Sequence, residues 1–377
     1  MNSIIEHQLW LYSAGGVPLT VINDGSFSGI NWGLRDIEAG VLELVLPGDF
    51  DRSLLQIDGQ IEIHRAVGYG QMKREGDTAF FIRRAIPSTD TNGVKTIAVT
   101  AYSAFELIDR RIVAYDAGTA YTSKTGILWP NFMRAIMREN YGSLATDTER
   151  NLSPWLTIEA DTTWGTNYTK GFSWRKVLNV LKDIVNDIRS TGVYCTFDVV
   201  RTTAPYFEFR VYLGPRGTDH RQGTAAPVII SEDNKTLLSP SVDNDWVTES
   251  NFVYGLGPGI EGARIIKTAR DDVRIGVSPF NRREFGAEAR NADATDAAVQ
   301  AEANAALEAH RPKKKFKGLI SQTDGCLYGV HWTWGDIVTA EYDGDTFDCY
   351  VDAVTVTVNE NGTEVATGVL RSVVDAG

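Results

Sequence analysis

The chain has 377 residues, 43% of them hydrophobic and 23% charged, which is typical of a folded soluble protein with room for about two to four domains. Its formal net charge of −12 argues against a nucleic-acid-binding protein, because such binding depends on Lys and Arg at phosphates. No apolar run is long enough to cross a membrane, no signal-peptide pattern opens the chain, and the three cysteines lack disulfide or metal spacing, so we expect reduced, buried thiols in a protein made in a cytoplasm.

Residues 1–113 predict a first small antiparallel β-barrel. Five short apolar or alternating runs are separated by turn residues, which is typical of a barrel or a sandwich. Asp58-Gly59 between two of these runs is a hairpin signal, and residues 103–111 predict a short helix at the exit of the barrel. The predicted strands cover residues 41–46, 54–57, 61–64, 80–86 and 96–102.

Residues 114–245 predict an α+β domain, because the apolar residues change to a helical period. One helix is expected over 129–141. A second is expected to begin after Phe172 with Ser173 as its N-cap, and to end before Gly192, which suits a left-handed C-cap. Two β runs, 193–200 and 206–213, follow it. The apolar stripe of the second helix consists of Trp174, Val177, Leu178, Leu181, Ile184, Val185 and Ile188.

Residues 246–377 predict a second β-barrel with an inserted helix over 293–311. Acidic residues early in this helix and the basic run 311–315 at its end suit the helix dipole. Its alanine-rich face is expected to lie against a sheet or a neighbouring subunit. Near the end of the chain, the alternating run 351–358 lies between two hairpin signals, Asp343-Gly344 and Asn361-Gly362. The alanines chosen to test a subunit contact are Ala298, Ala301 and Ala305.

No motif predicts a catalytic, cofactor-binding or metal site. The run 257–262 matches Gly-x-Gly-x-x-Gly, but a strand continues after it, so a glycine-rich bend is favoured over a nucleotide loop. Asp343, Asp345 and Asp348 lack the Gly and Glu of a calcium loop and are interpreted as turn residues. A carboxylate pair for sugar cleavage stays open, because such a pair needs only proximity in space. No metal or nucleophile spacing links the histidines, which are His7, His64, His220, His310 and His331.

Two groups of residues have both a functional and a structural interpretation. Five tryptophans in polar, turn-rich surroundings suit protein contact or sugar stacking, and equally suit packing under loops. The lysines at 313–315 and 317 suit phosphate contact, but a solvated helix end is favoured because the surrounding chain is acidic. The tryptophans are Trp10, Trp32, Trp155, Trp164 and Trp246.

The order of these segments resembles the tail hub, or baseplate hub, proteins at the distal end of tailed-phage tails, which have relatives in contractile injection systems. The likeness covers nearly the whole chain. It rests on residues 101–113 at the exit of the first barrel, on the helix between Phe172 and Gly192, and on residues 334–338, Trp-Gly-Asp-Ile-Val, in the last barrel.

This resemblance implies a structural virion protein without catalysis, assembled in the host cytoplasm. Hubs of this kind form a homotrimeric ring. Because each of the three subunits has two similar barrels, the ring has pseudo-sixfold symmetry and can bind the sixfold tail tube or distal tail protein. Its other side binds a threefold tip, spike or fibre. DNA is only transient cargo in the channel, which an acidic lining would repel, and no stable membrane insertion is expected. The alternatives are a carbohydrate-binding or cell-wall-degrading tail protein and a scaffold protein of an unrelated cellular machine.

Overall fold

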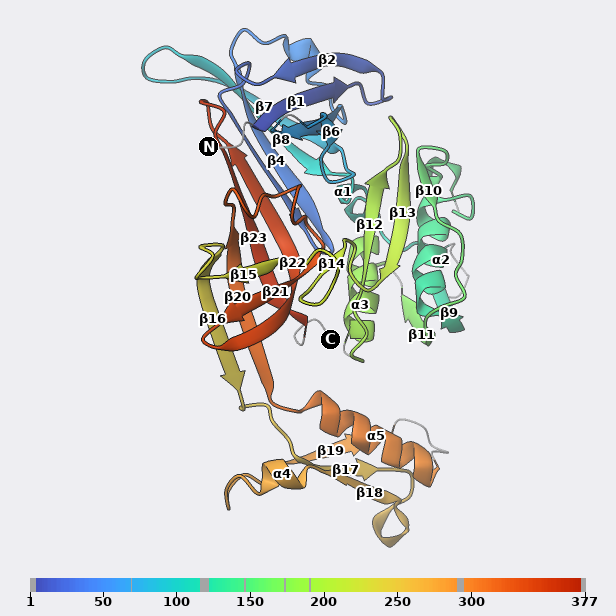
Figure 1. Cartoon of the computed structure of the whole chain (residues 1–377). Coiled ribbons are helices and arrows are strands. Elements are labelled where there is room, and N and C mark those ends of the chain that lie inside the picture. Colours follow the sequence, from blue (N-terminus) through green and yellow to red (C-terminus); the bar gives the residue numbers. More distant parts are fainter. Residues whose placement is uncertain are drawn as a thin grey trace. The chain divides into compact units, whose positions relative to one another are not determined.

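The computed structural model describes residues 5–68, 70–115, 122–145, 147–172, 174–189, 191–289 and 295–373 (Figure 1). The chain divides into two compact units. The larger consists of Met1–Pro240 with Gly318–Val373, and the smaller is built from Ser241–Lys317. None of the helices in the described ranges has the length and apolarity that a membrane span requires.

The larger unit is built on one mixed sheet of 15 strands. Its longest path of paired strands runs in the order β16-β20-β23-β22-β3-β4-β8-β7-β5-β1-β2, with β6, β14, β15 and β21 at its sides. In chain order these strands are β1 (Ile5–Tyr12), β2 (Pro18–Asn23), β3 (Gly29–Arg35), β4 (Glu38–Pro47), β5 (Gln60–Val67), β6 (Lys73–Arg74), β7 (Phe80–Thr89), β8 (Lys95–Ser103), β14 (Asp219–His220), β15 (Ile229–Ser231), β16 (Leu237–Asp245), β20 (Lys313–Ser321), β21 (Ile337–Tyr342), β22 (Asp345–Val358) and β23 (Glu364–Ser372).

The two ends of the chain meet in this sheet. β22 pairs antiparallel with β3, with Val356 opposite Trp32 and Val354 opposite Leu34. This ladder joins the strands of both predicted barrels into one sheet whose path begins at β16 and ends at β2, and no barrel closes among the described strands. The mainly-β class, with 46% strand and 17% helix, is confirmed, whereas the description as two barrels is not. The three-domain division at residues 113 and 245 stays a prediction.

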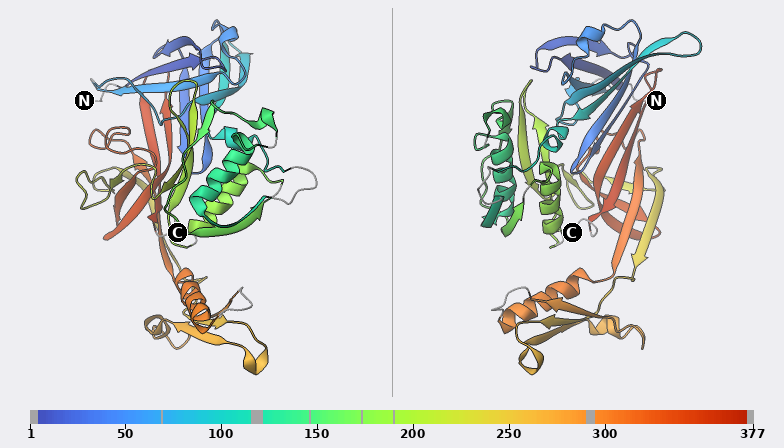
Figure 2. Two further views of the ribbon diagram at one scale, coloured as in Figure 1. Left: turned by 90° about the vertical axis from the view of Figure 1, so that its right-hand side faces the viewer. Right: turned by 180° about the vertical axis from the view of Figure 1, so that it is seen from behind.

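An α+β layer completes the larger unit, and its elements largely match the predicted ones (Figure 2). Two amphipathic helices pack on each other and on the sheet β10-β13-β12, in one core with Phe105 and Ile108. Gly192 has the positive φ of 84° expected at the helix end. The layer contains α1 (Glu106–Asp109), β9 (Thr122–Leu128), α2 (Trp129–Tyr141), η2 (Thr148–Arg150), β10 (Leu156–Ile158), β11 (Asn167–Phe172), α3 (Val177–Arg189), β12 (Cys195–Arg201) and β13 (Phe207–Leu213).

Two local predictions in the larger unit need correction. Residues 54–57 form no strand, because η1 (Arg52–Leu54) ends there and Asp58, at φ 56°, turns the chain directly into β5. Trp174 is 56% exposed with φ 54°, so it precedes α3 and does not belong to the buried stripe, which begins at Val177. The proposed N-cap, Ser173, lies outside the described residues.

The smaller unit is a three-stranded sheet covered by one helix. α5 (Asp296–Ala309) packs Val299, Ala303 and Leu307 toward β17 (Phe252–Leu256) and β18 (Ile266–Arg270). The helix approaches β17 so closely that a Cβ at Gly255 would lie 2.7 Å from the Val299 carbonyl oxygen. The remaining elements are β19 (Glu284–Glu288), η3 (Glu261–Ala263) and α4 (Asp272–Ile275).

The sequence predicts that the basic run after α5 forms the end of that helix, but in the structure it does not. α5 ends at Ala309 with His310 as its C-cap and no basic residue in its last turn. The lysines from 313 onward instead begin β20, whose pairing with β16 and β23 outweighs the local charge pattern. The predicted start at Asp293 lies outside the described residues.

The two C-terminal hairpins are confirmed. β21 and β22 pair up to Tyr342 opposite Asp345, which leaves Asp343 and Gly344 as a two-residue turn with φ of 52° and 79°. Both values are positive, as a type I′ turn requires. β22 and β23 follow with Gly362 at φ 74° in their turn.

Candidate functional site

The residues singled out from the sequence do not converge on one site. Residues 257–262 form the expected bend between β17 and β18. Within the described ranges, no group of three or more His, Cys, Asp or Glu side chains is arranged to hold a metal ion. The three cysteines are buried and free. Of the five tryptophans considered, Trp32 is a fully buried core residue, whereas Trp155 and Trp246 are 46% and 56% exposed.

The histidines have separate surroundings. His64 lies 3.2 Å from a Glu62 carboxylate oxygen and stacks on Trp10 at 5.1 Å. His220 lies 3.8 Å from the buried carboxylate of Asp336. His310 and His331 bond to backbone groups through Nδ1. His7 is the histidine whose own side chain is fully buried, and it belongs to a charged cluster.

That cluster is centred on Glu364, which β23 brings beside β1 and β5. The Arg65 guanidinium donates two parallel hydrogen bonds to the Glu364 carboxylate, from Nε at 2.6 Å and from Nη2 at 2.5 Å. His7 Nε2 lies 2.8 Å from the same carboxylate, and His7 Nδ1 lies 3.3 Å from Asp24 Oδ1. Burial opposes ionisation of Glu364, but the hydrogen bonds of His7 and Arg65 hold its pKa below the usual value. The Glu364 carboxylate therefore stays ionised in the core.

A second buried cluster is centred on Arg201 of β12. Arg201 Nε donates to Glu62 Oε1 at 2.7 Å, and Tyr12 donates its hydroxyl to Glu62 Oε2 at 3.1 Å. Burial again opposes the charge of Glu62, but hydrogen bonds from His64 and Arg201 and the positive charges of Arg201 and Arg74 lower its pKa to about 2. The cluster joins the α+β layer to β1 and β5.

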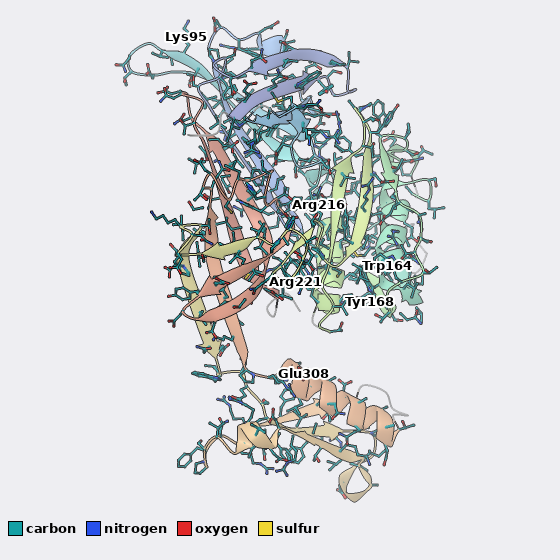
Figure 3. All side chains as sticks on the ribbon, viewed as in Figure 1. Lys95, Trp164, Tyr168, Arg216, Arg221 and Glu308 are labelled. Atoms are coloured by element: carbon teal, nitrogen blue, oxygen red, sulfur yellow. The ribbon has the colours of Figure 1, made fainter. Side chains whose placement is uncertain are left out.

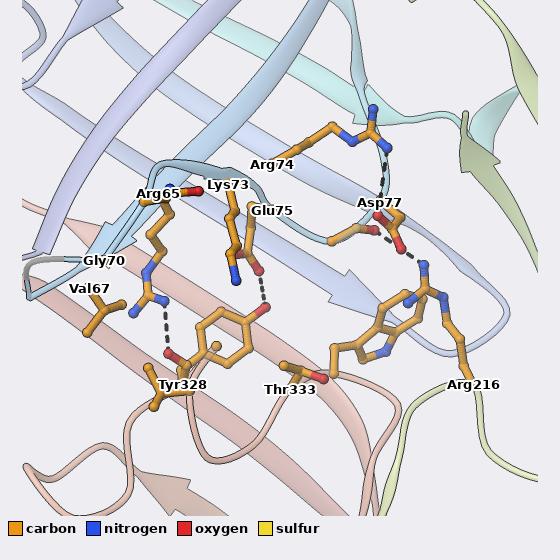
Figure 4. Close-up of a pocket in the computed structure, with 15 residues that line it drawn as sticks. Arg65, Val67, Gly70, Lys73, Arg74, Glu75, Asp77, Arg216, Tyr328 and Thr333 are labelled. Atoms are coloured by element: carbon orange, nitrogen blue, oxygen red, sulfur yellow. Dashed lines mark hydrogen bonds and ion pairs between the residues drawn. The ribbon is translucent and has the colours of Figure 1, made fainter. Parts of the chain in front are cut away.

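Between the clusters lies a cavity of about 530 Å³, which we call the junction cavity (Figure 4). Arg216 and residues of the loop between β20 and β21 provide part of its wall. The rest comes from the segment around β5 and β6, namely Arg65, Val67, Gly70, Gln71 and residues 73–77. Tyr328 donates its hydroxyl to Glu75, and burial raises the pKa of Glu75 above its ordinary value. Arg65 donates to the Tyr328 carbonyl at 2.8 Å, so the cavity wall and the Glu364 cluster are continuous.

Arg216 links this wall to the α+β layer. Figure 3 labels Arg216 between the strands of the large sheet and that layer. Its Nε donates to Asp198 Oδ2 at 2.6 Å, and its guanidinium lies 4.5 Å from the centre of the Trp334 ring. The cavity thus forms where all three predicted segments of the chain meet.

Sequence reasoning missed these charged residues. Arg65 and Glu364 are 299 positions apart, and no local pattern pairs them. The burial of β5 in the structure explains why these charges meet. Every residue of the strand is buried or half-buried, although it carries Glu62 and Arg65, so both of its faces are covered and its charges need internal partners.

The smaller unit exposes a set of large apolar side chains, which we call the apolar patch. Phe280 is 93% exposed, and Val273 and Val277 are 82% and 63% exposed. Arg283 donates to the carbonyls of Trp246 and Val247, so these two exposed residues lie beside the same loop. Exposed apolar residues grouped in this way are typical of a protein contact.

The fold is that of a mainly-β protein with a smaller α+β layer. Residues 26–368 match the family of Siphovirus ReqiPepy6 Gp37-like proteins, and the chain belongs to that family. No curated protein matches the sequence.

Three solved structures share the fold over almost their whole length. The tail protein from Neisseria meningitidis MC58 has 11% identity and a TM-score of 0.52, with 98% of this chain and 99% of that chain covered. The 43 kDa tail protein of prophage MuSo2 from Shewanella oneidensis has 12% identity, a TM-score of 0.54 and coverage of 98% and 99%. Prophage tail protein gp18 from Listeria monocytogenes EGD-e has 12% identity, a TM-score of 0.53 and coverage of 97% and 94%. The resemblance to phage tail proteins predicted from the sequence is confirmed.

Proposed function

We propose that this chain is a non-catalytic structural protein of a phage tail or tail-like particle, and that three copies form a hub ring at the distal end of the tail. The observation that carries the proposal is the shared fold with phage tail proteins over nearly the full length of both chains. In the proposed particle, the ring joins the tail tube or distal tail protein to the tip, spike or fibre.

The charge distribution supports a ring through which DNA passes. Residues 241–317 contain twelve basic and twelve acidic side chains, so the formal charge of −12 belongs entirely to the rest of the chain. A channel wall formed by the larger unit would repel DNA and keep it mobile. A channel wall that proved basic would contradict this part of the proposal.

The mass of the purified chain, measured by light scattering over a range of concentrations, tests the ring. We expect a species near three times 41.5 kDa at high concentration. If only monomer forms, adding the neighbouring tail proteins is the decisive second measurement. A chain that stays monomeric in their presence would overturn the trimeric hub.

A carbohydrate-binding or wall-degrading role is the second candidate. It is supported by an exposed aromatic pair, Trp155 and Tyr206, whose ring centres lie 6.0 Å apart at 36°. Aromatic faces of this kind stack on sugars. Retention of the chain on cell-wall material, lost in Trp155→Ala, would favour this role, and release of sugar or peptide fragments would show cleavage.

A further inference from the structure

The imidazole of His7 lies between two carboxylates in the core of the larger unit. Its Nε2 atom is 2.8 Å from Glu364 Oε2, and its Nδ1 atom is 3.3 Å from Asp24 Oδ1. An ionised carboxylate can only accept hydrogen bonds, and a neutral imidazole has a single N–H group, so the neutral ring can present a donor to only one of the two carboxylates. The imidazolium has an N–H on each nitrogen and presents a donor to both.

The charged groups around this ring balance only when it is protonated. Asp24 approaches it from the residue directly after β2, and Glu364 from the start of β23. Arg65 of β5 is the cation of the group, and it donates two hydrogen bonds to Glu364. Glu75 is a further acid that interacts with the ring at longer range, whereas the Trp32 ring of β3, 5.9 Å from the imidazole, is uncharged. One arginine thus faces at least two carboxylates, and a neutral imidazole leaves net negative charge in the core.

The two carboxylates differ in what holds them once the ring has lost its proton. The Glu364 side chain is fully buried and keeps its two hydrogen bonds from Arg65, so the remaining N–H of the ring stays with it at the shorter distance. The Asp24 side chain is 31% exposed, and it then faces the lone pair of Nδ1. A carboxylate that has lost its partner and has a path to water is more stable when it turns toward the solvent. Asp24 is therefore the group that moves.

Asp24 begins the turn between β2 and β3, residues 24–28, and ties this turn to β1. Its carboxylate accepts the backbone N–H of His7 at 2.7 Å, and its own N–H donates to the His7 carbonyl at 3.3 Å. Further along the turn, Phe27 is buried at 5% exposure. Movement of the Asp24 carboxylate thus loosens one end of a segment whose other anchor is an apolar side chain.

We propose that His7 is a pH-dependent latch, which as an imidazolium holds the turn 24–28 against β1 and on deprotonation releases it, while Glu364 stays bound to Arg65. The two carboxylates raise the pKa of His7 above its ordinary value, so the latch is closed at acidic pH and opens as pH rises through that raised value. The inference concerns a single chain and does not depend on the proposed hub function.

Rapid-quench hydrogen exchange of the full chain, read by mass spectrometry and corrected for the intrinsic exchange rate at each pH, tests the latch. We expect the protection of the backbone amides of residues 24–28 to fall by about tenfold or more between about pH 5.5 and about pH 9, because release removes a partly buried ion pair. The ladder between β12 and β13 is the internal reference and should keep the same protection at both pH values.

Two variants separate the latch from a general loss of stability. His7→Gln cannot carry a positive charge, so its turn should exchange rapidly at both pH values. Asp24→Asn keeps an oxygen that can accept the His7 backbone N–H and removes the charge, so its turn should stay protected at both pH values, and it tests the proposal even if the His7 variant is poorly folded.

The matched control is His331→Gln, which replaces a histidine that bonds to a backbone group. Its turn 24–28 should respond to pH as that of the wild type does. Equal corrected protection of the wild-type turn at both pH values, or an unchanged pH response in Asp24→Asn, would overturn the proposal.

Discussion

At the scale of single residues, the buried charges of the larger unit make its stability depend on pH. Burial opposes the charge of His7, but the carboxylates of Asp24 and Glu364 raise its pKa above the usual value of about 6.5. A group whose pKa is raised by folding contributes stability. This stability is fully present below the unfolded-state pKa and is lost as pH rises through the folded-state pKa. His7→Gln should therefore cost more free energy of unfolding at about pH 5.5 than at about pH 9, as measured by urea denaturation.

The matched control for this prediction is His331→Gln. His331 accepts a hydrogen bond from the Leu327 N–H at 2.8 Å and has a backbone partner in place of carboxylates. Because that bond needs an unprotonated Nδ1, His331→Gln should not cost more free energy at about pH 5.5 than at about pH 9, unlike His7→Gln. Equal costs of His7→Gln at both pH values would contradict an ionised His7.

Glu62 has the opposite dependence on pH. Its folded-state pKa of about 2 lies below its ordinary value of 4.5, so its contribution to stability is present above about pH 4.5 and is lost as pH falls toward 2. Glu62→Gln leaves the Arg201 guanidinium buried without its charged partner, which should cost about 3 kcal/mol near neutral pH. The difference from wild type should shrink when urea denaturation is repeated at about pH 3. A difference that stays constant over this range would mean that the ion pair contributes nothing to the pH dependence.

At the scale of elements, the Asp343-Gly344 hairpin allows the effect of backbone conformation on stability to be measured separately from side-chain packing. A Cβ at Gly344 would meet no atom within 4 Å, yet the residue has φ 79°. Gly344→Ala should therefore destabilise the larger unit by about 1 kcal/mol through backbone strain alone. Gly325 has the same open surroundings without a positive φ in the restricted range, so Gly325→Ala should be close to neutral in the same thermal-unfolding measurement. Equal effects of the two substitutions would contradict the type I′ turn.

Elements specified by neighbouring residues were predictable from the sequence, whereas those specified by distant partners were not. The two helices α2 and α3 and both C-terminal hairpins follow from local periodicity and turn residues. The ladder between β3 and β22 joins segments more than 300 positions apart, so the single sheet replaced two expected barrels. The charged wall of the junction cavity was unpredictable for the same reason, because the sequence shows neither which strands are covered on both faces nor which charges meet.

At the scale of the whole molecule, the two units differ in net charge and in exposed apolar surface. Residues 241–317 of the smaller unit are neutral and carry the apolar patch, whereas the larger unit is strongly acidic and buries its ion clusters. A neutral unit with exposed apolar side chains suits contact with another protein better than the acidic one does, because less charge must be desolvated. We therefore place the proposed subunit contact on the smaller unit.

The outer face of α5 provides the test of that placement. Ala298, Ala301 and Ala305 are exposed, while Val299, Ala303 and Leu307 of the same helix face its sheet. Replacing the three exposed alanines with Arg should leave the fold intact, since no buried atom is displaced, but should block close approach of a neighbour. We expect the circular dichroism spectrum to be unchanged and the trimer to be lost or weakened by about tenfold or more in light scattering. The control is the triple Ser variant, which keeps these positions small and uncharged and should assemble as wild type does. Normal assembly of the Arg variant would move the contact away from α5, and the exposed Phe280 of the apolar patch would then be the next surface to substitute.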